Sequence, residues 1–191
     1  DIVMATDPDA DRVGFAIRDD KGKLVLLNGN QIVALLTSYM LTRWSELGKL
    51  RGREYVVKTI VTTELIRDIC DKYGVELYNV LTGFKWISKL IREREGKENY
   101  IIGGEESFGL MIGDQIRDKD GISAVALCCE MAAYEKNKGR SLYEKLIDLY
   151  VQYGLYKESL VSITKKGMNG AKEIADMMEG YRNNPPQTID G

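Results

Sequence analysis

Residues 54–61, with the sequence EYVVKTIV, form a run of apolar and β-branched side chains that is long enough for one buried strand. The chain after this run alternates amphipathic stretches of helical spacing with apolar stretches of strand length. These elements are expected at residues 65–73 (helix), 75–81 (strand), 84–94 (helix) and 100–103 (strand). Because strands that alternate with helices pair in parallel, the sequence predicts an α/β fold.

The segment before this alternation predicts a strand, a tight loop and a second strand within residues 1–27. The turn signal NGN at residues 28–30 separates this hairpin from a helix at about 31–47. A hairpin of this kind cannot bury its apolar faces alone. We therefore expect residues 1–27 to be the end of a domain whose sheet lies mostly outside this sequence.

After the alternation, the sequence predicts a helix at about 122–137 and a second helix that begins with a capping box made by Ser141 and Glu144. A strand is expected at 155–164 and a helix at 171–181. The expected domains are residues 1–27, residues 28–155, and a linker with the start of a further domain at residues 156–191.

The composition indicates a globular protein without an electrostatic footprint for nucleic acid. The chain is 44% hydrophobic and 29% charged, with a net charge of −2 and a pI near 5.4. No apolar run approaches the ~20 residues that span a bilayer, so we expect no membrane partner. Three cysteines without metal-ligand spacing favour reduced thiols and a cytoplasmic location. The sequence contains no histidine, so proton transfer would fall to Lys, Asp, Glu or Tyr.

Residues 6–12, TDPDADR, place three carboxylates at alternate positions in the loop of the first hairpin. Side chains two residues apart in an extended segment lie on the same side, so the three aspartates can converge on one ion. A calcium EF-hand begins with the same pattern, but it requires Gly and Glu where this sequence has Arg12 and Arg18. Carboxylates without a neighbouring His or Cys favour Mg²⁺ completed by phosphate oxygens. The alternative interpretation is a solvated acidic turn.

A second candidate loop, residues 103–109 with the sequence GGEESFG, leaves the last strand of the alternation. Its carboxylates and hydroxyl can bind the vicinal hydroxyl groups of a sugar, although a solvated turn is the alternative. TGFK at residues 82–85 opens a helix, so its backbone N–H groups and Lys85 can meet an anionic oxygen, although a plain strand-to-helix turn is the alternative. Lys58 lies near the end of a buried strand, where α/β sites collect.

DPDADR, TGFK, GGEESFG and RDKDG, in this order, resemble the α-D-phosphohexomutases, the family of phosphoglucomutase and phosphomannomutase enzymes. The resemblance covers nearly all 191 residues. It implies a three-layer mixed sheet with flanking helices, as in the third of the family's four domains. It also implies that the chain spans the end of the second domain, the third, and the start of the fourth. The family's phosphoserine loop and C-terminal phosphate loop are not found in this sequence.

The resemblance assigns a metal site and a sugar site to particular residues. The implied Mg²⁺ ligands are Asp7, Asp9 and Asp11, which would hold the ion against the phosphoserine. The implied sugar contacts are Glu105 and Ser107, which match the Glu and Ser of the family's sugar-binding loop.

The remaining implied roles belong to the substrate anion and to proton transfer. Gly83 and Lys85 match the turn that faces the active cleft, and Arg12 matches the arginine beside the metal aspartates. Lys119 matches a lysine that is a candidate acid or base, and Lys58 is the other candidate. Either lysine suits this role near neutral pH if desolvation or neighbouring cations lower its pKa.

The implied activity is an intramolecular phosphotransfer between hexose 1-phosphate and hexose 6-phosphate, through a phosphoserine and a bisphosphorylated intermediate. The implied cofactors are Mg²⁺ and glucose 1,6-bisphosphate, and the implied partners are the hexose phosphate and the remaining domains of the same chain. The GEESFG form favours glucose over mannose. Because the nucleophile is missing, we expect these 191 residues alone to be inactive.

Two other functions remain open at this point. One is a non-catalytic module that binds Mg²⁺ or a sugar phosphate. The other is a haloacid-dehalogenase-type phosphatase, whose strand ends in DxDx(T/V); here Asp11 occupies the position of the Thr or Val.

Overall fold

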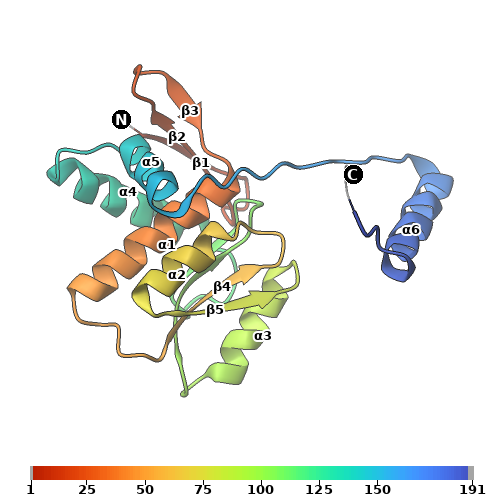
Figure 1. The fold of residues 1–191 in the computed structure, drawn as a ribbon, viewed down its shortest axis with the longest axis horizontal. Helices are drawn as coiled ribbons and strands as arrows, with labels where there is room; N and C mark the ends of the chain where they lie inside the picture. The colour runs from red at the N-terminus through yellow and green to blue at the C-terminus, as the bar shows by residue number, and fades with distance from the viewer. Residues whose placement is uncertain (1, 189–191) are drawn as a thin grey trace. The chain divides into compact units, whose positions relative to one another are not determined.

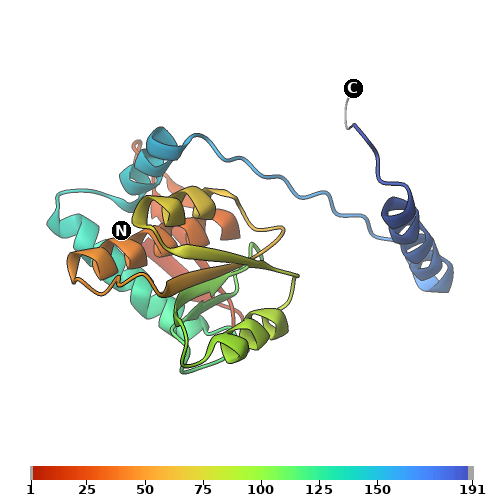
Figure 2. The ribbon, with the colours of Figure 1, turned by 60° about the horizontal axis from the view of Figure 1, so that its bottom comes forward.

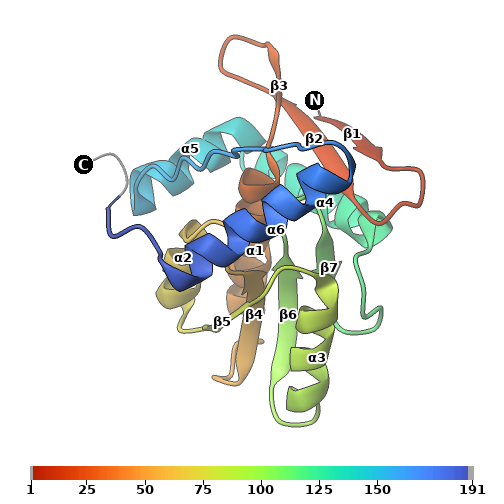
Figure 3. The ribbon, with the colours of Figure 1, turned by 90° about the vertical axis from the view of Figure 1, so that its right-hand side faces the viewer.

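A four-stranded sheet forms the centre of the compact unit that ends at Glu158, in a computed structural model that describes residues 2–188. Its strands are β4 (Glu54–Thr59), β5 (Glu76–Val80), β6 (Asn99–Gly104) and β7 (Leu110–Ile112). The order across the sheet is β5-β4-β6-β7 (Figure 3). Strand β4 is parallel to β5 and β6, whereas β7 is antiparallel to β6. The sheet is therefore mixed.

Helices cover both faces of this sheet. The helices α1 (Gly29–Glu46) and α2 (Leu65–Tyr73) lie on one face, and α3 (Phe84–Arg94) lies on the other (Figures 1 and 2). Alternate residues of β4 point to the two faces, since Val56 belongs to the core under α1 and α2, and Val57 to the core under α3. All six residues of β4 are buried, as in strands covered on both sides. The expected three-layer α/β architecture is confirmed.

A second, antiparallel sheet lies at the start of the chain. It contains β1 (Ile2–Thr6), β2 (Val13–Arg18) and β3 (Leu24–Leu26), in that order. The alternate residues Val13, Phe15 and Ile17 of β2 are buried in the core that also contains residues of α4 (Gly121–Asn137) and α5 (Leu142–Tyr153). Residues 2–27 therefore pack against the helices of the unit, and the domain boundary expected near residue 27 stays a prediction.

The ends of the helices follow the expected local chemistry. The Ser141 hydroxyl accepts from the Glu144 N–H at 3.1 Å, and the Glu144 carboxylate accepts from the Ser141 N–H at 2.7 Å. This capping box starts α5 as predicted. Gly74 ends α2 in the left-handed conformation with φ 63°, which glycine adopts without strain.

The second compact unit of the chain begins at Ser159. The prediction of a strand at 155–164 is wrong, because residues 154–166 form neither helix nor strand. A strand needs a partner for its backbone groups, and no described strand pairs with this segment. Helix α6 spans Gly167–Asn183, so it begins before the expected residue 171. A residue larger than glycine would not fit at position 170 of this helix, because its Cβ would lie 2.7 Å from the Lys165 carbonyl carbon.

Residues 1 and 189–191 of the expected terminal domains lie outside the described residues. Among residues 2–188, no helix is both long enough and apolar enough to cross a membrane.

Candidate active site

The loops that follow the three parallel strands lie at one edge of the sheet. Strand β6 ends at Gly104 and continues into residues 105–109, which we call the sugar loop. Strand β5 ends at Val80, and Gly83 is the N-cap of α3. Ligands of α/β proteins bind at this carboxyl edge of the strands. The structure therefore places two of the predicted site segments where such a site is expected.

The aspartate loop, residues 7–12, connects β1 and β2 as a tight turn. Asp7, Asp9 and Asp11 each offer a carboxylate oxygen, and these oxygens all lie within 4.8 Å of one another. The Asp7 carboxylate accepts from the backbone N–H groups of Asp11 and Arg12, both at 3.1 Å. The turn places Ala10 at φ 57°, an uncommon conformation for a residue with a side chain. The predicted convergence of the three aspartates is thus present in the geometry.

The electrostatics of the aspartate loop suit a hard cation. The N–H of Arg12, followed by further hydrogen bonds from Asp11, lowers the pKa of Asp7 despite some desolvation. Asp7 therefore stays ionised at a lower pH than an ordinary aspartate. The three carboxylates supply oxygen ligands only, which are the ligands that Mg²⁺ prefers. The donor set fits Mg²⁺.

The sugar loop is held in shape by its own hydrogen bonds. Glu105 is 6% exposed, and its Oε1 accepts from the Gly83 N–H at 2.7 Å. The Ser107 hydroxyl donates to Glu105 Oε2 at 3.4 Å, and the Glu105 N–H donates to the Gly109 carbonyl at 2.9 Å. Phe108 closes the turn at φ 71°. The predicted residues Glu105, Ser107 and Gly83 are therefore neighbours in one bonded cluster.

The aspartate loop and the sugar loop are joined directly. The Val13 N–H donates to the Phe108 carbonyl at 3.3 Å, and Arg12 forms an antiparallel bridge with Gly109. The Gly121 N–H, at the start of α4, donates to the Ala10 carbonyl at 3.0 Å. Two loops about one hundred residues apart in sequence thus form one continuous surface. No local sequence pattern predicts this bridge.

Lys119 connects the same two loops through its side chain. Its Nζ lies 3.0 Å from Asp11 Oδ2, and its chain lies beside Gly109, where an added Cβ would be 2.6 Å from Lys119 Cδ. Burial alone would lower the pKa of Lys119, but the carboxylates of Asp11 and Asp118 outweigh it and raise the pKa. A lowered pKa, which is the condition for proton transfer by Lys119 near neutral pH, is therefore not met in the described structure, in which the nearest charges are negative.

Lys58 occupies a different environment from the one its sequence position predicts. Its side chain is 0% exposed, and Nζ contacts the Thr62 carbonyl at 2.9 Å, the Thr59 carbonyl at 3.4 Å and Glu64 Oε1 at 2.8 Å. These contacts use all three ammonium protons to fix the loop between β4 and α2. They favour a structural role, so Lys119 is the better placed of the two candidates.

The other two predicted cations are accessible. The Arg12 side chain is 51% exposed, and its Nε lies 3.7 Å from Asp11 Oδ1. Lys85 is exposed at the start of α3, with Nζ 5.3 Å from the centre of the Trp86 ring. Among residues 2–188 no carboxylate forms an ion pair with Lys85. Both side chains are free to meet a substrate anion.

Glu106 anchors the sugar loop to the end of β4, and sequence reasoning did not single it out. Its carboxylate accepts from the Thr62 hydroxyl at 3.1 Å and from the Thr59 hydroxyl at 3.3 Å. Both threonines are almost fully buried, and their hydroxyl oxygens lie 2.7 Å apart. Gly29 packs so closely beneath this point that an added Cβ would lie 1.9 Å from the Glu106 carbonyl oxygen. The available signal was the pair of threonines at the carboxyl end of the buried strand β4.

The comparison with protein families identifies a domain. Residues 28–153 match the family model described as phosphoglucomutase/phosphomannomutase, alpha/beta/alpha domain III. A phosphoglucomutase of Staphylococcus aureus (strain MRSA252) is 38% identical over 191 residues, which are 100% of this chain and 34% of that protein. The chain thus spans about a third of the length of the curated relatives it matches.

Solved structures agree with this match. A putative phosphomannomutase from Thermus thermophilus has a TM-score of 0.64 at 29% identity, over 81% of this chain and 31% of that one. The Aspergillus fumigatus N-acetylphosphoglucosamine mutase, in complex with GlcNAc-6P and magnesium, has a TM-score of 0.60 at 16% identity, over 78% and 35% of the chains. The second likeness concerns the fold alone. Because residues 28–153 match the family model and the Staphylococcus aureus enzyme aligns with all of this chain, the chain belongs to the phosphoglucomutase/phosphomannomutase family.

Proposed function

We propose that this chain is the metal- and sugar-binding part of a phosphohexomutase that interconverts glucose 1-phosphate and glucose 6-phosphate. The observation that carries the proposal is the direct junction of the aspartate loop with the sugar loop. Arg12 pairs with Gly109, and the Lys119 ammonium lies against Asp11. A cation site and a sugar site that share one surface suit the transfer of a phosphoryl group to a sugar hydroxyl.

The aspartate loop would hold Mg²⁺ through Asp7, Asp9 and Asp11. The bound ion would supply charge neutralisation for the phosphoryl group that is transferred. Magnesium is present with the sugar phosphate in the solved Aspergillus mutase, which supports this assignment. Arg12 would meet a non-bridging phosphate oxygen, because its planar guanidinium is half exposed beside the aspartates.

The sugar loop would hold the hexose through the Glu105 carboxylate and the Ser107 hydroxyl. Glu105 is pre-organised by the Gly83 N–H at 2.7 Å on one oxygen. Its other oxygen, which accepts only a long bond of 3.4 Å from Ser107, would also accept from a sugar hydroxyl. Lys119 stays protonated at neutral pH because its pKa is raised. It would therefore act first as a proton donor and as a cation beside the phosphate, and Lys85 would contribute a second positive charge.

The phosphoserine, the bisphosphorylated intermediate and the domain boundaries are further parts of this proposal. The phosphoserine, and glucose 1,6-bisphosphate as the intermediate, require domains that the chain does not contain. We propose residues 1–27 as the end of the second domain, 28–155 as the third domain, and 156–191 as a linker with the start of the fourth. The match at residues 28–153 supports the middle division. Membership of this family leaves the haloacid-dehalogenase alternative without support.

An assay of the full-length parent chain tests the function. Glucose 1-phosphate and mannose 1-phosphate would be supplied with Mg²⁺ and a trace of glucose 1,6-bisphosphate, and the hexose 6-phosphate products measured by coupled dehydrogenases. We expect turnover of glucose 1-phosphate with the higher kcat/KM, in keeping with the phosphoglucomutase of Staphylococcus aureus. A higher kcat/KM for mannose 1-phosphate would overturn the substrate, and binding without turnover of either would support a non-catalytic module.

A further inference from the structure

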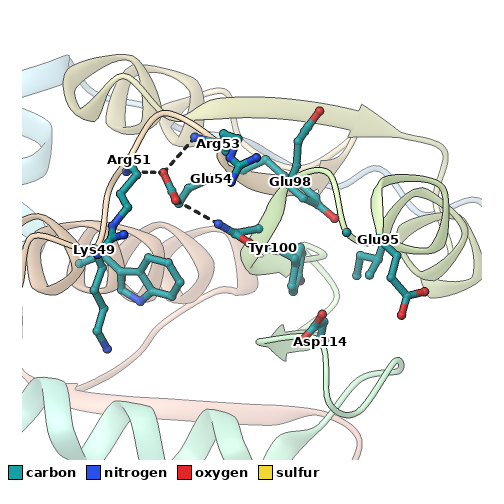
Figure 4. A pocket seen from close by; sticks show the side chains of 13 residues that line it. Lys49, Arg51, Arg53, Glu54, Glu95, Glu98, Tyr100 and Asp114 are labelled. Atoms are coloured by element: carbon teal, nitrogen blue, oxygen red, sulfur yellow. Dashed lines mark hydrogen bonds between the residues drawn. The ribbon is translucent and has the colours of Figure 1, made fainter.

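A pocket lies at the edge of the four-stranded sheet where the parallel strands begin, opposite the edge that carries the two site loops. Figure 4 shows this pocket and the side chains that line it. Its volume is about 550 Å³, within the range of small-molecule sites. The first residues of β4 and β6 line it, together with the C-terminal turns of α1 and α3. Strand β4 runs from this pocket to the site edge, a separation of roughly 20 Å at ~3.3 Å per residue. None of the residues assigned to the candidate active site lines this pocket.

Glu54 fixes the loop that carries two arginines to this pocket. It is 4% exposed, and its Oε2 accepts from the backbone N–H groups of Arg51, Gly52 and Arg53 at 2.7, 3.0 and 3.1 Å (Figure 4). The Asn99 side chain donates to its other oxygen at 3.2 Å. Burial raises the pKa of Glu54, but these donors outweigh it and the pKa lies below its ordinary value. The Glu54 carboxylate is therefore bound by backbone N–H groups, and it does not neutralise the guanidinium groups of Arg51 and Arg53.

The positive charges on this side of the pocket have no acidic partner. Among residues 2–188, no carboxylate forms an ion pair with Arg51, Arg53 or Lys49. The nearby acids are already paired, since Glu98 binds Arg94 at 2.5 Å and Glu95 binds Arg117 at 3.0 Å. Two guanidinium groups and one ammonium therefore give this rim a net attraction for an anion.

The opposite rim and the walls have a different character. Asp114 lies across the pocket from the arginines and forms no ion pair among the described residues (Figure 4). The walls include the Trp44 ring, which has Lys49 Nζ 5.8 Å from its centre, and the buried rings of Tyr55 and Tyr100. A ligand that is complementary to these groups has an anion for the arginines, a flat ring that packs against Trp44, and hydrogen-bond donors for Asp114.

We propose that this pocket binds a small organic phosphate with a flat aromatic ring, of the class of a nucleoside monophosphate. The phosphate contacts the guanidinium groups of Arg51 and Arg53, the flat ring packs against Trp44, and N–H or O–H groups of the ligand donate to Asp114. Arginine pairs are well suited to phosphate because their planar N–H groups match its oxygens. The site does not depend on the mutase function, because it shares no residue with the aspartate loop or the sugar loop.

Tryptophan fluorescence tests the proposal with adenosine 5′-monophosphate as the probe. The chain has two tryptophans, so the Trp86→Phe variant reports on Trp44 alone. We expect a saturable change in Trp44 fluorescence with the nucleotide, and at least tenfold weaker binding of adenosine, which lacks the phosphate. Arg51→Ala and Arg53→Ala should each weaken nucleotide binding at least fivefold. Both substitutions keep the backbone N–H groups that Glu54 binds, so the loop retains its anchor.

Arg92→Ala is the matched control, because Arg92 is an exposed arginine of α3 that does not line the pocket. Its affinity for the nucleotide should equal that of the parent variant. The proposal is overturned if the nucleotide gives no saturable change, if adenosine binds as tightly, or if Arg92→Ala weakens binding as much as the pocket substitutions. Circular dichroism of each variant confirms that a loss of binding is not a loss of fold.

Discussion

Asp9 is the most exposed of the three aspartates, and no hydrogen-bond donor among the described residues occupies its carboxylate. Its oxygens are therefore the most available to a cation. In the full-length enzyme we predict that Asp9→Asn lowers kcat by about 100-fold or more, as expected when transition-state charge loses its stabilisation. Titration of activity with Mg²⁺ checks this, with Asp20→Asn in the exposed β2–β3 turn as the control. Unchanged kcat and unchanged Mg²⁺ dependence would remove the metal assignment.

Glu105 and Ser107 can be separated from folding by conservative changes. Glu105→Gln keeps an oxygen for the Gly83 N–H, and Ser107→Ala removes only a long hydrogen bond of 3.4 Å. We predict losses of about 1–3 kcal/mol in transition-state binding, the size of a hydrogen bond to a polar substrate. Steady-state kinetics of the full-length variants with glucose 1-phosphate measure this loss. Wild-type kcat/KM in both variants would exclude these residues from the sugar site.

Substitution of Glu106 tests whether substrate binding depends on the position of the sugar loop as well as on the contacts that Glu105 and Ser107 make. Its carboxylate bonds Thr59 and Thr62 rather than facing the site. We predict that Glu106→Ala raises KM for the hexose phosphate about tenfold and leaves Mg²⁺ affinity unchanged, because it frees the loop and not the aspartates. Glu106→Gln keeps an acceptor for the threonines and should restore most of the KM. Equal KM in Glu106→Ala and the wild type would limit this residue to stability.

At the residue scale, the sequence predicts which side chains carry the chemistry better than it predicts where each side chain points. The alternate spacing of Asp7, Asp9 and Asp11 was sufficient to predict their convergence, because the loop between two strands is short. The sequence does not show that the Lys58 side chain turns to Glu64 and two backbone carbonyls, because these contacts depend on the tertiary structure. The raised pKa of Lys119 follows from Asp11, which lies more than one hundred residues away in the sequence.

At the scale of elements, the N-terminus of α1 and the sugar loop constrain each other. Gly29, in the first turn of α1, has no room for a methyl group beside the Glu106 carbonyl. We predict that Gly29→Ala destabilises the protein by about 1–3 kcal/mol, the usual cost of overpacking, and raises KM for the sugar phosphate. Urea unfolding measures the first effect. Gly14→Ala is the control, because nothing lies within 4 Å of its added Cβ, and it should change stability far less.

Elements with their own periodicity and caps were predictable, and those that depend on a partner were not. The helices α2 and α3 begin and end close to the expected residues, and α5 begins at its expected capping box. The glycine that ends α2 and the capping box of α5 are local signals. The antiparallel strand β7 is only three residues long and is defined by its pairing with β6. The segment at 155–164 has the alternation of a strand but no described strand beside it. Alternation alone therefore does not create a strand.

At the scale of the whole molecule, the unit that ends at Glu158 contains one continuous core that includes β2, α1 and α5. A core of this extent supports independent folding of the unit. The aspartate loop and the sugar loop belong to this unit, so we expect it to keep the metal and sugar sides of the site. The chain covers 34% of its phosphoglucomutase relative, and the nucleophile that we propose lies in the remainder.

The central claim is that these 191 residues supply the metal and sugar sides of a mutase site without its nucleophile. The most direct test is a coupled glucose 6-phosphate assay of the purified 191-residue chain with glucose 1-phosphate, Mg²⁺ and glucose 1,6-bisphosphate, beside the full-length parent chain. We predict no isomerisation by the 191-residue chain, although it is folded by circular dichroism, and clear isomerisation by the parent chain. Bisphosphate-dependent turnover by the 191-residue chain itself, retained after a contaminating enzyme is excluded, would contradict the claim.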